Sequence, residues 1–197
     1  MKWFILLFFI SLEAFSQEKN YDSLQVSIDP EVQGTLLSPK GGNQPPLAIL
    51  IAGSGPTDRD GNQAQLKNNS LKYLAEGLAQ KGIATFRYDK RVIAQINKAT
   101  VQEEKMTFED EVNDALLVVN HFKDKYKKII LIGHSEGALI GLLVAQKVVV
   151  SKFVSISGAG NSSATLIEEQ IGKNAPRLKE ESQKIISQLR KGELVEN

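Results

Sequence analysis

Short apolar runs alternate along the chain with longer segments in which apolar residues recur every three or four positions. Near the start, residues 24–28 and 32–37 alternate apolar and polar positions, which predicts two half-exposed strands joined in a hairpin. The run at 47–52 is continuously apolar, as is typical of a strand buried on both faces. Further strands are predicted at 83–88, 128–132 and 153–157.

Segments with helical spacing separate these strands. Leucines recur three or four positions apart over 71–78 until Gly82, which predicts one helix. Thr107 and Asp110 match a capping box at the start of a second, amphipathic helix. A third helix, over 136–146, is apolar on nearly every side, so we expect it to be packed inside, its leucines included. Strands alternating with helices predict an α/β fold with a mainly parallel sheet.

The first residues have the layout of a targeting segment. After Lys2, residues 3–10 are uninterruptedly apolar, and the small residues Ala14 and Ser16 follow at the spacing of a cleavage site. We therefore interpret 1–16 as a secretory signal peptide and expect a periplasmic or secreted protein. The apolar run is too short to span a membrane, so no stable span is expected after its removal. A buried strand or an uncleaved anchor is the alternative.

The last part of the chain differs from the alternating pattern. Beyond Gly160 no further strand is predicted, and two helical segments follow, the second of them beginning at Pro176. We interpret 17–160 as the core and 161–197 as the start of a helical cap.

Composition removes several classes of function. The 24 basic and 23 acidic residues nearly cancel, so no nucleic-acid partner is expected. Without cysteine the chain has no thiolate catalysis and no cysteine-ligated metal, and two histidines, His121 and His134, make a histidine metal site improbable on composition. Neither glycine-rich nucleotide-binding pattern follows a strand. We expect neither a metal nor another cofactor.

An acidic stretch at 58–62 resembles the beginning of a calcium loop. Its acidic spacing is too short, and Asn69 occupies the twelfth position, where such a loop has glutamate. We interpret the stretch as a structural turn with a local Asp–Arg pair.

The candidate chemistry lies at Gly133-His134-Ser135-Glu136-Gly137, between a predicted buried strand and a predicted buried helix. This G-x-S-x-G pattern in this context predicts a nucleophile elbow, a turn so tight that both flanking positions must be small. The turn exposes the Ser135 hydroxyl, and the amides at the start of the helix face the same point, where they stabilise negative charge. A glycine-rich turn that merely contains a serine is the alternative.

Three motifs together resemble the α/β-hydrolase superfamily, in particular its exported esterases and serine-aminopeptidase-like hydrolases. They are GHSEG after KIILI, IAGSGPTDRDGN after the earlier strand, and FRYDKR in the next one. The resemblance implies a serine hydrolase that acts on small esters or short peptides through an acyl-enzyme on Ser135. It also implies an oxyanion hole made by the amides of Ser54, or less favourably Gly55, and Glu136. In the family a glycine usually follows the arginine of the third motif, but here it is Val92.

The rest of a catalytic triad is not found where the family carries it. The family order is nucleophile, acid, histidine, yet no aspartate and no histidine follow Ser135. His134 adjoins the nucleophile, and because neighbours in a sharp turn point apart we do not assign it as the base. His121 is interpreted as a solvated surface residue. We therefore expect that the sheet is incomplete at its C-terminal side and that the chain is truncated within a helical cap. We also expect the chain alone to be nearly inactive. A non-catalytic binding protein with the same fold remains the alternative.

Overall fold

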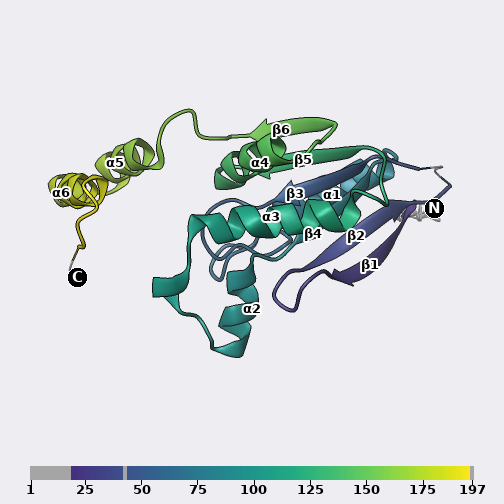
Figure 1. Ribbon diagram of the computed structural model, residues 1–197, viewed down its shortest axis with the longest axis horizontal. Helices are drawn as coiled ribbons and strands as arrows, with labels where there is room; N and C mark the ends of the chain where they lie inside the picture. The colour runs from purple at the N-terminus through teal and green to yellow at the C-terminus, as the bar shows by residue number, and fades with distance from the viewer. Residues whose placement is uncertain (1–18, 42–43, 196–197) are drawn as a thin grey trace, which may run out of the picture.

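The computed structural model describes residues 19–41 and 44–195, so the predicted signal peptide lies outside the described residues. In this part of the chain the strands are β1 (Tyr21–Ser27), β2 (Gln33–Pro39), β3 (Leu47–Ile51), β4 (Ala84–Tyr88), β5 (Ile129–His134) and β6 (Lys152–Ile156). They form one sheet in the order β1-β2-β4-β3-β5-β6 (Figure 1). The hairpin of β1 and β2 is antiparallel and β2 pairs antiparallel with β4, whereas β4, β3, β5 and β6 run parallel.

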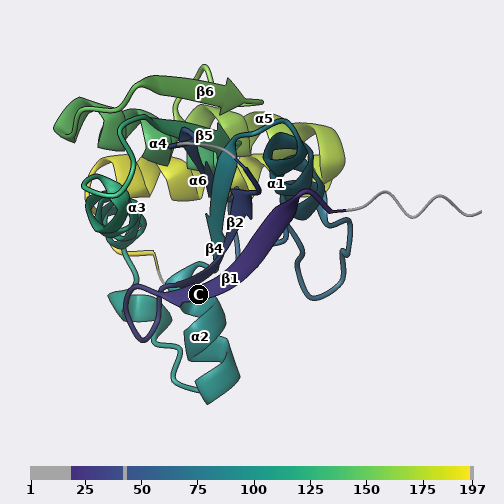
Figure 2. The same ribbon diagram turned by 90° about the vertical axis from the view of Figure 1, so that its right-hand side faces the viewer.

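Helices cover both faces of the sheet (Figure 2). Successive side chains of β3 point to opposite faces, so Ile49 packs in the core beneath α3 (Phe108–Phe122) and α4 (Glu136–Lys147), while Leu50 packs beneath α1 (Ser70–Gln80). The predicted capping box begins α3, with Thr107 and Asp110 bonding reciprocally. The expected α/β architecture is confirmed.

The segment after β4 forms a helix that the sequence analysis did not predict. Helix α2 (Arg91–Lys98) contains no buried residue and is followed by the short η1 (Glu103–Lys105). Its apolar positions, among them Val92 and Ile96, recur at helical spacing, and this was the available signal. The helix lies near the carboxyl ends of the parallel strands (Figure 1).

The expectation that α4 is buried on every side is wrong. Ile140 and Val144 are buried against the sheet, but Leu139 and Leu142 are 37% and 44% exposed, and Leu143 is only half-buried. The physical reason is that α4 lies near the edge of the sheet. Within 19–41 and 44–195, β6 is the edge strand and pairs with β5 alone. No element in these ranges therefore covers the outer side of α4.

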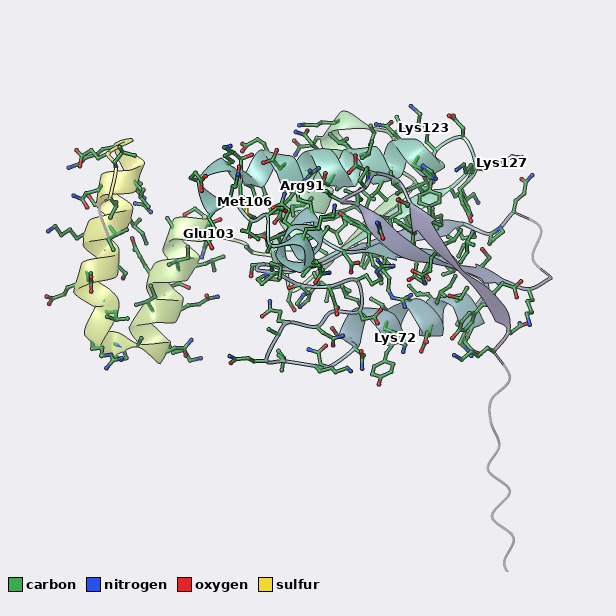
Figure 3. All side chains as sticks on the ribbon, turned by 90° about the horizontal axis from the view of Figure 1, so that it is seen from below. Lys72, Arg91, Glu103, Met106, Lys123 and Lys127 are labelled. Atoms are coloured by element: carbon green, nitrogen blue, oxygen red, sulfur yellow. The ribbon has the colours of Figure 1, made fainter. Side chains whose placement is uncertain are left out.

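Two helices follow β6, as predicted. Helix α5 (Ser163–Asn174) leads through η2 (Pro176–Leu178) to α6 (Lys179–Arg190), and α5 and α6 pack against each other. They stand away from the sheet in two views (Figures 1 and 3). The division into core and cap stays a prediction. No helix of the described part of the chain is long and apolar enough to cross a membrane.

Candidate active site

Ser135 occupies the turn between β5 and α4 in a strained conformation. Its φ of 54° and ψ of −119° are disfavoured for any residue with a side chain. The backbone is held there from both sides: the Ser135 amide donates to the carbonyl of Ile156 at 2.9 Å, and the Ala138 amide donates to the carbonyl of Ser135 at 3.0 Å. The predicted strand-to-helix turn is confirmed.

The two glycines of the motif are required by close packing. A Cβ on Gly133 would overlap the carbonyl group of Gly137, and a Cβ on Gly137 would overlap the carbonyl oxygens of Ile51 and Ala52. The start of α4 therefore lies directly against the end of β3, and only hydrogen at both positions permits this approach.

The loop after β3 lies beside the elbow, as the sequence predicts. A Cβ on Gly53 would be 3.3 Å from the Cβ of Ser135 and 3.1 Å from Nδ1 of His134. The carbonyl of Ser54 accepts hydrogen bonds from Thr57 Oγ1 and Gln63 Nε2, both at 3.0 Å. These bonds fix the loop. A hollow at the elbow is lined by residues of both segments and of the following loop, among them Gly53, Ser54, Gln63, Leu66, His134 and Ser135.

The two candidate oxyanion-hole residues come from different segments that meet at Ser135. Ser54 lines the same hollow, and Glu136 is the first residue of α4, where an amide has no acceptor within the helix. The role of their backbone amides in binding an oxyanion remains a proposal.

Neither histidine is bonded to the serine. In the described part of the chain, no hydrogen bond joins Ser135 to His134 or His121. The His134 ring and the Ser135 Cβ both lie beside Gly53. That His134 does not act as the base stays a prediction. His121 lies on α3, where its Nε2 is 2.9 Å from Lys125 Nζ, and partial burial together with that lysine lowers its pKa.

The acidic stretch is a structural turn, but its ion pairs are not local. Asp58 Oδ1 accepts from the amides of Asp60 and Asn62, which closes the turn. Arg59 pairs with Asp89 beyond β4, and Asp60 accepts from Arg87 Nε of β4 at 2.8 Å. The turn is therefore attached to the neighbouring strand, which the sequence spacing could not show. No group of three potential metal ligands occurs within 19–41 and 44–195.

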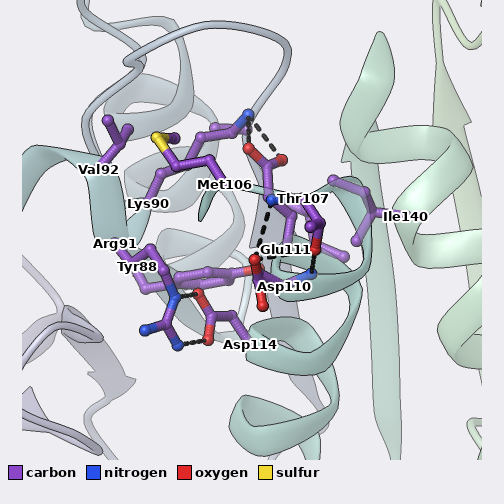
Figure 4. Close-up of a pocket in the computed structure, with 12 residues that line it drawn as sticks. Tyr88, Lys90, Arg91, Val92, Met106, Thr107, Asp110, Glu111, Asp114 and Ile140 are labelled. Carbon is purple, nitrogen blue, oxygen red and sulfur yellow. Dashed lines mark hydrogen bonds and ion pairs between the residues drawn. The ribbon is translucent and has the colours of Figure 1, made fainter. Parts of the chain in front are cut away.

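A buried lysine next to the elbow was missed by the sequence analysis. Lys90 Nζ is 3.0 Å from Glu111 Oε1 and 2.8 Å from Glu111 Oε2, which is not oriented for a hydrogen bond (Figure 4). Lys90 Nζ is also 3.0 Å from Glu136 Oε1. Its position in the third motif was the only signal, because Glu111 lies far along the chain on α3. Burial raises the pKa of Glu111, opposed by the ammonium of Lys90.

A second ionic cluster lies beside it. Arg91 pairs with Asp114 of α3 and, at 2.8 Å, with Glu31 in the β1–β2 hairpin loop. Burial raises the pKa of Asp114 although the guanidinium of Arg91 acts in the opposite direction. This cluster connects α2, α3 and the hairpin.

The sheet order, the glycine-flanked elbow and the helices on both faces define an α/β-hydrolase fold. By its fold the chain is similar to the α/β-hydrolases.

Known proteins agree with this assignment. The chain is 30% identical over 139 residues to esterase EstD of Thermotoga maritima, a match that covers 70% of this chain and 33% of EstD. The chain thus spans about a third of the length of that curated relative. No protein-family model matches the chain.

Solved structures share the fold. The Pyrococcus furiosus esterase Pf2001 aligns with a TM-score of 0.54 at 18% identity, over 90% of this chain and 64% of that one. Est1E from Butyrivibrio proteoclasticus aligns with a TM-score of 0.50 at 22% identity, over 76% of this chain and 54% of that one. At these identities the likeness is one of fold.

Proposed function

We propose that the chain carries the nucleophile and the oxyanion hole of a serine ester hydrolase. The observation that carries the proposal is the strained backbone of Ser135 in a turn that tolerates only glycine on either side. Strain of this size persists where the surroundings impose it, and it is characteristic of functional sites. The similarity to EstD supports an ester as the substrate class.

In the proposed reaction, Ser135 Oγ adds to the carbonyl carbon of the ester while its proton passes to a base. The amides of Ser54 and Glu136 stabilise the negative charge on the former carbonyl oxygen. The bond to the alcohol then breaks, and the alcohol leaves with the proton. Water attacks the acyl-enzyme in the same way, which releases the acid and restores the serine.

The acid and the histidine are proposed to come from sequence other than these 197 residues. Two facts support this: no aspartate or histidine follows Ser135, and the chain corresponds to a third of EstD. Residues 17–197 alone should therefore hydrolyse esters at least about a thousandfold more slowly than a protein with a complete triad.

The apolar part of the ester is proposed to bind beside α2. An open, mainly apolar hollow lies there. It is lined by Gly55 and Pro56 of the loop after β3, by Val92, Ile96, Val101 and Met106, and by Glu103 and Glu111. Ile96 and Met106 are 49% and 40% exposed, so the hollow presents apolar surface next to the loop that follows β3. Burying an acyl chain there would release water from both surfaces.

Turnover of p-nitrophenyl esters tests the proposed function in the product of the whole gene, which is proposed to supply the acid and the histidine as well as these residues. Ser135→Ala should abolish turnover, whereas the exposed Ser187→Ala should not change it. A fluorophosphonate should label Ser135, located by peptide mass spectrometry. Turnover or labelling that persists in Ser135→Ala would contradict the proposal, and a folded protein that binds esters without cleaving them would favour the binding-protein alternative.

Export is part of the proposal as well. It rests on the apolar segment at residues 3–10 and the small residues before Gln17. Sequencing the mature protein from a secreting host should give Gln17 as the first residue. A mature protein that retains Trp3 would contradict cleavage.

A further inference from the structure

Lys90 is buried at the junction of three elements. It follows β4, and its side chain is only 7% exposed. Its ammonium lies between Glu111 in the first turn of α3 and Glu136 in the first turn of α4. The residue before Glu136 is Ser135. Through the side chain of Glu136, Lys90 is therefore connected to the turn that holds the candidate nucleophile.

The cavity that Lys90 itself lines is too small for a substrate. The cavity that it lines with Glu111 and Ile140 has a volume of about 30 Å³, which accommodates a water molecule or two. Removing an ammonium from water costs several kcal/mol unless it is paired, and here two carboxylates from different helices provide the pairing. A buried ion pair is weak evidence for stability but serves well to fix a geometry.

The ion pair between Lys90 and Glu136 fixes the geometry of the first turn of α4. Glu136 supplies both the carboxylate that Lys90 holds at 3.0 Å and the amide that the proposed function places in the oxyanion hole. Since side chain and amide belong to the same residue, anchoring one restrains the other. Glu111 holds the same ammonium from a second helix, α3, so Lys90 does not simply follow Glu136 if the start of α4 moves.

We propose that Lys90 is a positioning residue for the oxyanion hole, acting through its ion pair with Glu136 and braced by Glu111. The inference rests on the proposed function, because it concerns the amide of Glu136 in that reaction. Lys90 itself does not contact the reacting atoms.

The neighbouring Arg91 offers a matched control. It also carries a charge held by an acidic residue of α3, Asp114, but its second partner is Glu31 rather than Glu136. Losing either cation leaves carboxylates without their partner and lowers stability, whereas only Lys90 connects to the elbow. Comparing the two variants therefore separates a loss of stability from a loss of positioning.

The experiment measures kcat and KM for a p-nitrophenyl ester and the Ki of a trifluoromethyl ketone, which forms a tetrahedral adduct with a serine. The variants are Lys90→Met, Lys90→Arg, Arg91→Met and the exposed Lys127→Met, all in the full gene product and well below their melting temperatures. Lys127 lies at the far end of the body from Met106 (Figure 3).

For Lys90→Met we expect kcat to fall and the ketone Ki to rise by about 10- to 100-fold, with KM within about twofold. Lys90→Arg should recover most of the loss, because it keeps the charge. Arg91→Met should lower the melting temperature by a similar amount and leave kcat and Ki within about twofold of wild type.

Two results would overturn the inference alone: Lys90→Met with unchanged kcat and Ki, or equal losses of kcat in Lys90→Met and Arg91→Met. Wild-type protein without Ser135-dependent turnover would overturn the proposed function, and the inference with it.

Discussion

Gly137 lies so close to the carbonyl oxygen of Ala52 that no side chain fits between them. The contact joins the first turn of α4 to the end of β3, and it sets how near the elbow approaches the loop at Gly53. The close approach of α4 to β3 is thus set by the two backbones.

Gly137→Ala should therefore damage both stability and activity. The added methyl group would have to push α4 away from β3, a kind of overpacking that typically costs about 1–3 kcal/mol. Denaturant unfolding and ester turnover measure the two effects. The exposed Gly77→Ala, on α1 with free space around its Cα, is the control and should be neutral or slightly stabilising.

Two residues on α4 should respond differently to truncation. Ile140 is 1% exposed, so Ile140→Ala should lower the free energy of unfolding by about 2–5 kcal/mol. Leu142 is 44% exposed, and Leu142→Ala should cost about 1 kcal/mol or less. Urea unfolding followed by circular dichroism compares them. Equal losses would mean that the outer side of α4 is covered in solution.

The capping box of α3 should make stability depend on pH. Hydrogen bonds from the amide and hydroxyl of Thr107 lower the pKa of Asp110 in the folded protein. A lowered pKa means that the contribution of Asp110 is present above the ordinary aspartate pKa of about 4 and is lost as the pH falls below it. Asp110→Asn should thus lower the melting temperature at pH 7, and the difference from wild type should shrink towards pH 3. A constant difference between these pH values would contradict this account.

The apolar hollow beside α2 should discriminate among acyl chains. Ile96→Ser removes apolar surface from it, so kcat/KM for a hexanoate ester should fall by about tenfold while that for an acetate ester stays within about twofold. Since Ile96 is 49% exposed, folding should be little affected. Leu24→Ser is the control, because Leu24 is also an exposed apolar residue but lies on β1. A parallel loss for both esters would place the acyl group elsewhere.

Much of the fold and the centre of the site could be predicted from the order of residues. Alternating apolar runs and helical spacing depend on local periodicity, and so the hairpin, the parallel strands, α1, α3 and the two last helices were predicted. The G-x-S-x-G elbow is equally local, because the turn and its steric demands involve five consecutive residues.

Only the tertiary structure decided how distant segments meet. Composition made α4 look buried on all sides, yet burial depends on what lies next to the helix, and its outer side is uncovered. The ion pairs of Arg59 and Asp60 reach β4 and its end, and Lys90 joins Glu111 to Glu136 across 21 and 46 residues of sequence. Charge pairing acts over a few ångströms in space. These distances arise only when the sheet brings the strand ends together, so the sequence alone does not show which charges meet.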